Sequence, residues 1–158
     1  MANRGRRIAG LWQPVGGREC HAIKGSPRCH AINSSDTVPV LISLGARVKI
    51  IKKGQERVVH FKDFFQDNGV HPTVLAPEEM VSAILIPREA SSARMIFLKI
   101  AMRKGIDFSM GNIAGFLFQN GKGADDLRLV LNCISSTPIS LKKAVQVITD
   151  AGFTDASI

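Results

Sequence analysis

Residues 28–46 read Arg-Cys-His-Ala-Ile-Asn-Ser-Ser-Asp-Thr-Val-Pro-Val-Leu-Ile-Ser-Leu-Gly-Ala, and they carry the start and stop signals of a helix. Asp36 is a favourable N-cap residue, Pro39 lies in the first turn, and Gly45 follows the last apolar position. This pattern predicts a short helix over residues 37–44. Just upstream, the tetrapeptide Cys-His-Ala-Ile occurs at 20–23 and 29–32, and we expect two short strands there around a turn at 24–27.

The chain continues from the helix as short strands. Residues 46–52 alternate weakly, and Lys53-Gly54-Gln55 predicts a tight turn into a second strand at 57–61. A short helix is expected at 60–65. Residues 80–86 are almost entirely apolar, which predicts a mostly buried strand.

A linker is predicted at 87–92. Three strands should follow it, at 94–103, 111–119 and 127–134, with a hairpin turn at 120–123. Residues 141–149 place apolar side chains at helical spacing, and Gly152 would end that helix. Residues 1–17, which glycine and proline interrupt, are expected to be irregular.

Composition excludes several classes of protein. The chain has 158 residues, of which 45% are hydrophobic, enough for one ordinary domain or two small ones. Its net charge is +8, but the basic residues are scattered, only 6% of residues are aromatic and tyrosine is absent, so no nucleic-acid partner is expected. The apolar runs are too short for membrane insertion, and the arginines near the N-terminus lack the apolar core of a secretory signal. With three cysteines and no export signal, we expect a cytoplasmic protein.

The repeated Cys-His pairs at 20–21 and 29–30 bring together side chains that bind metals. A zinc site usually has a closer cysteine pair, and neighbouring residues of a strand point to opposite faces, so the four side chains are not expected to converge. Three interpretations remain: a zinc site, part of an iron–sulfur site that needs four thiolates, or two reduced structural cysteines. Cys133 lies in a strand pattern and is expected in the core.

Asp36 and Lys99 are the other candidate site residues. Asp36 is first an N-cap, but a capping carboxylate can also accept a hydrogen bond from a ribityl or ribose hydroxyl. Lys99 interrupts an apolar strand, so its ammonium must reach solvent, pair with an acid or contact a ligand. The chain contains no nucleophile elbow and no glycine-rich phosphate-binding loop, so neither self-contained hydrolase chemistry nor a phosphate site of its own is expected.

Taken in order, these segments resemble the flavin-binding subunit of the molybdenum hydroxylases, the family of xanthine dehydrogenase, carbon monoxide dehydrogenase and 4-hydroxybenzoyl-CoA reductase. The likeness covers nearly the whole chain from about residue 18. Order and spacing carry it, rather than any one motif. After residues 28–46 it continues through 59–65, 75–79, 84–87, 97–99, Arg103, 106–108, 127–131 and 136–138.

The resemblance implies an α+β fold. Residues 1–86 would be the end of a vanillyl-alcohol-oxidase-type FAD-binding module. Residues 87–158 would form a small three-stranded antiparallel sheet with a helical layer, truncated because the family's C-terminal helix has no counterpart.

The resemblance also implies FAD as the cofactor. Asp36 would contact the flavin nucleotide, Val81 would pack near the isoalloxazine, and Lys99 would lie close to the ring, where its charge stabilises an anionic reduced flavin. Cys20 and Cys29 match two of the four [4Fe–4S] ligands in the hydroxybenzoyl-CoA reductase branch. The third ligand should fall near Trp12 and the fourth before residue 1, so this ligand set is incomplete.

We therefore expect a partial flavoprotein subunit of a molybdenum-hydroxylase-type oxidoreductase. It would relay electrons between FAD and iron–sulfur centres in a hetero-oligomer with a molybdopterin-containing large subunit and an iron–sulfur small subunit. The family's two glycine-rich FAD loops are absent from the chain, which implies a fragment of a longer subunit or a truncated paralogue that needs a partner. The alternative is a non-enzymatic assembly or metal-binding module that keeps the fold and has lost the cofactor.

Overall fold

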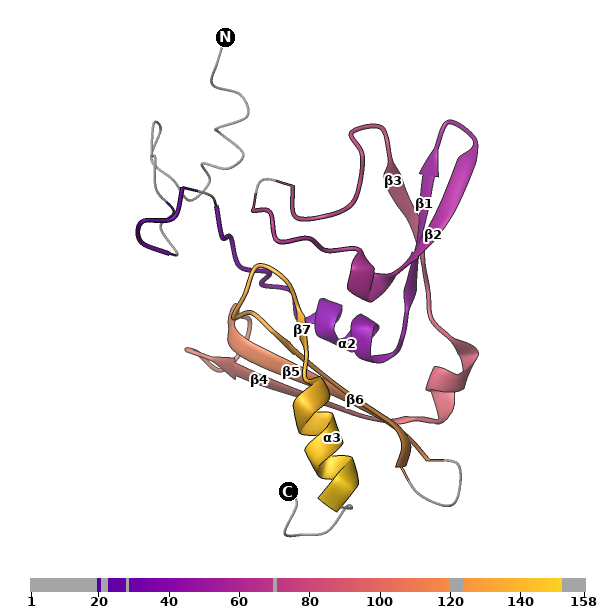
Figure 1. The fold of residues 1–158 in the computed structure, drawn as a ribbon, viewed down its shortest axis with the longest axis vertical. Helices are drawn as coiled ribbons and strands as arrows, with labels where there is room; N and C mark the ends of the chain where they lie inside the picture. The colour runs from indigo at the N-terminus through magenta and orange to yellow at the C-terminus, as the bar shows by residue number, and fades with distance from the viewer. Residues whose placement is uncertain (1–19, 21–22, 28, 70, 120–123, 152–158) are drawn as a thin grey trace.

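Two antiparallel sheets organise the protein, and helix α2 (Thr37–Ser43) lies between them (Figure 1). The structure is a computed structural model and describes residues 20, 23–27, 29–69, 71–119 and 124–151. The predicted irregular segment 1–17 and the hairpin turn at 120–123 lie outside these residues. The predicted helix over 37–44 is confirmed to within one residue.

The first sheet has the strand order β2-β1-β3 and confirms the predicted hairpin. A two-residue turn joins β1 (Arg47–Lys52) to β2 (Gln55–His60), and a 3-10 helix, η1 (Phe61–Asp63), follows. The turn residues Lys53 and Gly54 both have positive φ, 42° and 81°, which is the backbone that two-residue hairpins favour. Strand β3 (Met80–Leu85) pairs with the other side of β1.

The second sheet has the order β4-β5-β6-β7. Its three long strands are the predicted ones: β4 (Arg94–Ala101), β5 (Ser109–Gln119) and β6 (Ala124–Asn132). Strand β7 (Ile139–Ser140) adds a short fourth strand at the β6 edge, and helix α3 (Lys142–Ala151) packs against β6. The 3-10 helix η2 (Arg88–Ser92) connects the two sheets where the linker was predicted.

One core joins α2 to both sheets. The buried side chains of Val38 and Ile42 from α2 meet Val48 and Ile50 from β1 and Val130 from β6. Phe61 and Phe64 close this core, with ring centroids 6.0 Å apart. The core therefore fixes the start of α2 above strands β5 and β6.

Two of the strand predictions are wrong. The described residues between 20 and 32 form turns and bends without a strand, because the Cys20 N–H donates to the Ser26 carbonyl at 2.9 Å and closes a local loop. Strand β3 exists, but it is largely exposed rather than buried, with Met80 60% accessible. An apolar sequence predicts burial only where another layer covers the strand, and β3 lies at the edge of its sheet.

Gly45 ends helix α2 in a Schellman motif. Its φ is +71°, its N–H donates to the Ile42 carbonyl, and the next N–H, of Ala46, donates to the Leu41 carbonyl. Gly45→Ala is expected to lower the free energy of unfolding by about 1–2 kcal/mol, because a Cβ is disfavoured in this left-handed backbone. Urea unfolding measures the loss.

Gly54→Ala is the matched control for this prediction. Gly54 has a similar φ of +81°, but a Cβ there would meet nothing within 4 Å. A Cβ at Gly45 would lie 2.7 Å from Arg128 Nη1, so the Gly45 variant should lose more stability. An unchanged free energy of unfolding in Gly45→Ala would contradict the assignment of the motif.

Candidate functional site

The structure brings Asp36 and Lys99 together, although 63 residues separate them in the sequence. Lys99 lies on β4, and its Nζ donates to Asp36 Oδ2 at 2.6 Å and to the Asp107 carbonyl at 2.6 Å. The sequence left three possibilities for the Lys99 ammonium: to reach solvent, to pair with an acid or to contact a ligand. The structure shows that it pairs with an acid, Asp36. Both side chains stay accessible, Lys99 at 25% and Asp36 at 41%, so a ligand could reach the pair.

Asp36 occupies the N-cap position of α2, but its side chain does not cap the helix. The Val38 N–H donates instead to Ser35 Oγ at 3.3 Å. Asp36 Oδ1 turns toward the second sheet, where it accepts hydrogen bonds from Ser109 Oγ at 2.5 Å and Asn112 Nδ2 at 2.9 Å. The interpretation of Asp36 as a side-chain cap is therefore wrong, because these donors and Lys99 hold its carboxylate.

This network favours the charged form of Asp36. The hydrogen bond from Lys99 contributes most to lowering the pKa of the Asp36 carboxyl below 3.8, and the Ser109 hydroxyl also lowers it. Partial burial opposes this shift, while the Asn112 amide and the positive charge of Lys99 add to it. At neutral pH an ionised carboxylate therefore sits beside an ammonium at the start of α2.

Strand register explains how these side chains meet. Lys99 on β4 lies directly opposite Asn112 on β5, which lies directly opposite Asn132 on β6. The three side chains form one polar row across the sheet. The Asn132 Nδ2 donates to the Ser35 carbonyl at 2.8 Å and to Asn33 Oδ1 at 3.2 Å, so the row also holds the segment that leads into α2.

Sequence reasoning missed Ser109, Asn112 and Asn132. Ser109 and Asn112 lie near the start of β5 and Asn132 ends β6, and all three are buried. A polar residue beside largely apolar strand residues was the signal available from the sequence. Cys133, which follows Asn132, is buried as predicted and has a positive φ of 67°. Burial raises the pKa of the Cys133 thiol, so it is a poor nucleophile.

Val81 lies in the other sheet, on β3, where it pairs with Ile50 of β1. Its side chain is 37% exposed. Strand pairing therefore ties Val81 to the first sheet, and its predicted contact with a flavin ring stays a prediction.

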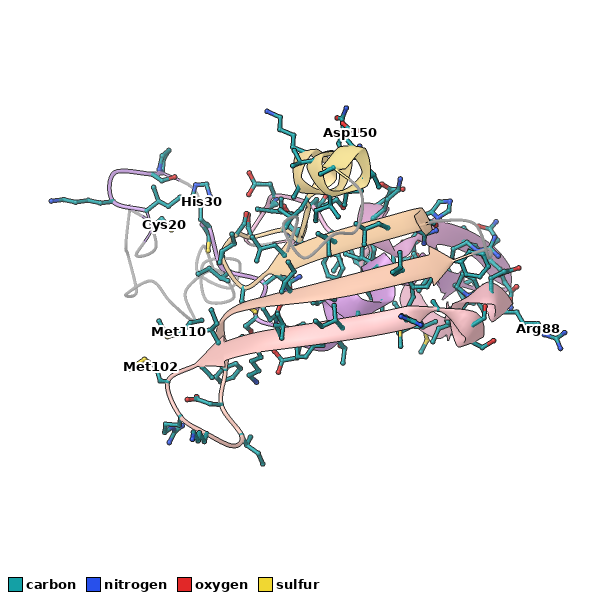
Figure 2. The ribbon with its side chains drawn as sticks, turned by 90° about the horizontal axis from the view of Figure 1, so that it is seen from below. Cys20, His30, Arg88, Met102, Met110 and Asp150 are labelled. Atoms are coloured by element: carbon teal, nitrogen blue, oxygen red, sulfur yellow. The ribbon has the colours of Figure 1, made fainter. Side chains whose placement is uncertain are left out.

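Cys20 and Cys29 are both free thiols in the structure. Cys20 is buried, and its Sγ accepts a hydrogen bond from the His30 N–H at 3.3 Å; Figure 2 shows the two residues side by side. The His30 ring is engaged with Ser26, with Nε2 2.9 Å from Oγ. Within the part of the chain that the structure describes, no three His, Cys, Asp or Glu side chains are grouped closely enough to hold a metal ion, and His21 lies outside that part.

A cavity of about 760 Å³ lies elsewhere, between the C-terminal end of α2, η2, strands β5 and β6, and the start of α3. Arg128 lies in its wall, 5.0 Å above the Phe116 ring, and donates to the Ser43 carbonyl at 3.2 Å. Asp36, Val81 and Lys99 do not line this cavity. The candidate site is therefore the hydrogen-bonded network of Asp36, Lys99, Ser109 and Asn112 at the start of α2, and not this cavity.

The stability contributed by Asp36 should depend on pH. Because its pKa is lowered on folding, the charged form stabilises the protein above pH 3.8, and this contribution is lost as the pH falls through the folded-state pKa. Urea unfolding from pH 7 down to pH 2 should therefore show a gap between the wild type and Asp36→Asn that closes in acid. A gap of constant size at every pH would contradict this account of the ion pair.

Residues 15–89 match the family described as FAD binding domain in molybdopterin dehydrogenase. No helix among the described residues is long and apolar enough to cross a membrane.

Solved structures give the same fold. Carbon monoxide dehydrogenase from Hydrogenophaga pseudoflava matches 79% of this chain with a TM-score of 0.69 and 19% identity. Reconstituted CO dehydrogenase from Oligotropha carboxidovorans matches 72% with a TM-score of 0.63 and 24% identity. Quinoline 2-oxidoreductase from Pseudomonas putida 86 matches 73% with a TM-score of 0.58 and 23% identity.

The chain spans about two fifths of the length of these solved relatives, 42%, 39% and 39% respectively. The resemblance to the FAD-binding subunit of the molybdenum hydroxylases, stated from the sequence, is confirmed by the family match and the shared fold. The α+β fold class is confirmed with it.

Proposed function

We propose that this chain forms part of the flavin site of a molybdenum-hydroxylase-type oxidoreductase. The observation that carries the proposal is the Asp36–Lys99 pair, with 2.6 Å between Lys99 Nζ and Asp36 Oδ2. The resemblance assigns both residues to the flavin, and the fold holds them in contact. Two elements far apart in the sequence thus meet at the place where a cofactor contact is expected.

The donor set fits the sugar chain and ring of FAD. A lysine ammonium has three donors, and the bonds to Asp36 and Asp107 use two, which leaves one for an acceptor on the cofactor. A carboxylate has about four acceptor positions, and the bonds from Lys99, Ser109 and Asn112 use three, which leaves one for a sugar hydroxyl.

Apolar side chains flank this pair. Phe97 lies two residues before Lys99 on β4, hence on the same face of the strand, and is 40% exposed. Figure 2 shows Met102 and Met110 together at one end of the sheet, and both are exposed. Such surfaces suit the flat ring of a flavin, and they would exclude water from it.

The pyrophosphate of FAD has no matching element in this chain. The sequence holds no glycine-rich phosphate loop, so we propose that residues beyond this chain hold the phosphates. FAD supplies the electron-transfer chemistry when bound. Lys99 would place a positive charge beside the ring, and Asp36 would orient the sugar chain and keep that lysine in place.

The remaining assignments extend this proposal. The chain would relay electrons between FAD and iron–sulfur centres of an iron–sulfur small subunit, with a molybdopterin-containing large subunit in the same cytoplasmic complex. Residues 1–86 would belong to the FAD-binding module and residues 87–158 to the following domain. Cys20 and Cys29 would supply two ligands of a [4Fe–4S] cluster only together with two thiolates from elsewhere.

Isolation of the native complex through this chain tests the proposed function. The flavin absorbance of the complex, and the identity of the released cofactor by chromatography, are measured. We expect FAD in a fixed ratio to the chain. A complex that contains the chain with its partners but no flavin would contradict the proposal.

A further inference from the structure

We propose that Asn112, together with Ser109, is a positioning residue of the flavin site, holding the Asp36 carboxylate so that Lys99 presents its ammonium to the cofactor. This inference rests on the proposed function. It adds two residues that the sequence did not single out, and it states how they act: through Asp36, without touching the cofactor.

The hydrogen bonds of Asn112 point to this role. Its side chain is 2% exposed, and its Nδ2 lies 2.9 Å from Asp36 Oδ1, 3.2 Å from Ser109 Oγ and 3.4 Å from the Ser35 carbonyl. Ser109 Oγ donates to the same carboxylate oxygen at 2.5 Å. Two donors from β5 therefore fix one oxygen of Asp36, which leaves the other oxygen directed at Lys99.

The neighbouring asparagine provides the contrast. Asn132 lies directly opposite Asn112 and is equally buried, but its amide donates to the Ser35 carbonyl and to Asn33, and no hydrogen bond joins it to Asp36 among the described residues. In both asparagines the Oδ1 atom is buried and has no partner in the described structure. A buried unpartnered carbonyl is unfavourable, so two apolar side chains would be expected here unless the amide donors were needed.

Other charged groups around Asp36 cannot replace these donors. Lys99 reaches Asp36 from β4, and Asp107 holds Lys99 through its backbone carbonyl. Arg103 bonds the Asp107 carboxylate, and the thiol of Cys133, which directly follows β6, interacts with Ser109 and Asn112 rather than donating to Asp36. Without Asn112, the carboxylate keeps only Ser109 on Oδ1, so its orientation and that of Lys99 are less tightly fixed.

Asn112→Leu, with Asn132→Leu as the matched control, tests the inference in the full chain. Both changes remove a buried amide of the same size from the same sheet. The pKa of Asp36 is followed by carbon NMR of labelled aspartate without ligand, and the FAD dissociation constant is measured by titration. We expect Asn112→Leu to raise the pKa of Asp36 and to weaken FAD binding about three- to tenfold. Asn132→Leu should leave that pKa unchanged.

Ser109→Ala gives a second variant in case Asn112→Leu does not fold. It removes one small donor and should raise the Asp36 pKa in the same direction. If the Asp36 pKa in both Asn112→Leu and Ser109→Ala equals that of the wild type, or if Asn132→Leu shifts it as much, the inference is overturned. If the pKa shifts as expected but the wild-type chain and its complex bind no FAD, the proposed function is wrong. The conclusion that Asn112 and Ser109 position the Asp36 carboxylate is then still supported.

Discussion

Replacing Lys99 by methionine is expected to raise the FAD dissociation constant at least about tenfold. A hydrogen bond to a charged group contributes about 1.5–3 kcal/mol, and 1.4 kcal/mol corresponds to a factor of ten. Methionine keeps the length and the apolar stem of lysine but has no ammonium. The loss should be larger for reduced than for oxidised FAD, because the reduced ring carries the negative charge that Lys99 would face. Titration under oxidising and then reducing conditions measures both constants.

Arg103→Met is the matched control for this variant. Arg103 is also a cation near β4, but it is 77% exposed and its guanidinium bonds the Asp107 carboxylate. Both variants lower the net charge by one, so a general effect of charge on an anionic cofactor would appear equally in both. Equal losses in the two variants would contradict a direct role of Lys99.

Replacing Ile50 by alanine is expected to lower the free energy of unfolding by about 2–5 kcal/mol. Ile50 is 1% exposed and belongs to the core that joins α2 to both sheets. Its loss leaves a cavity in the core that Ile50 shares with Phe61 and Phe64. Domains are stable by only about 5–15 kcal/mol, so this change removes a large share of that stability. Urea unfolding monitored by circular dichroism measures it.

Ile51→Ala provides the comparison on the same strand. Ile51 points to the opposite face of β1 and is only half-buried, so the same truncation should cost clearly less. Similar losses for the two variants would show that the core does not lie on the Ile50 face. Because this core supports the start of α2, Ile50→Ala should also reduce FAD binding in proportion to the fraction unfolded.

Local signals in the sequence predicted much of the fold. Asp36, Pro39 and Gly45 marked helix α2 because capping and termination depend on neighbouring residues. Lys53 and Gly54 marked the first hairpin for the same reason. The exposure of β3 could not be predicted, because an apolar run such as Met80–Leu85 does not show whether another element of the protein packs over the strand.

The polar row at the site was hidden for a different reason. Asn112 and Asn132 meet only through the register of β5 and β6, which a single sequence does not fix. The prediction that the Asp36 side chain caps the helix was wrong because Ser35, one residue earlier, accepts the Val38 N–H and leaves the Asp36 carboxylate free for the sheet. The resemblance named Asp36 and Lys99, but only the folded chain showed them bonded to one another.

NMR of labelled aspartate and lysine side chains during titration of the full chain with FAD tests the central claim most directly. The method detects weak binding, which matters because the chain lacks a phosphate loop. The account predicts saturable changes in the Asp36 carboxyl and Lys99 amine resonances. The account would be contradicted if the resonances of both residues stayed fixed throughout the titration, whether or not FAD bound elsewhere on the chain.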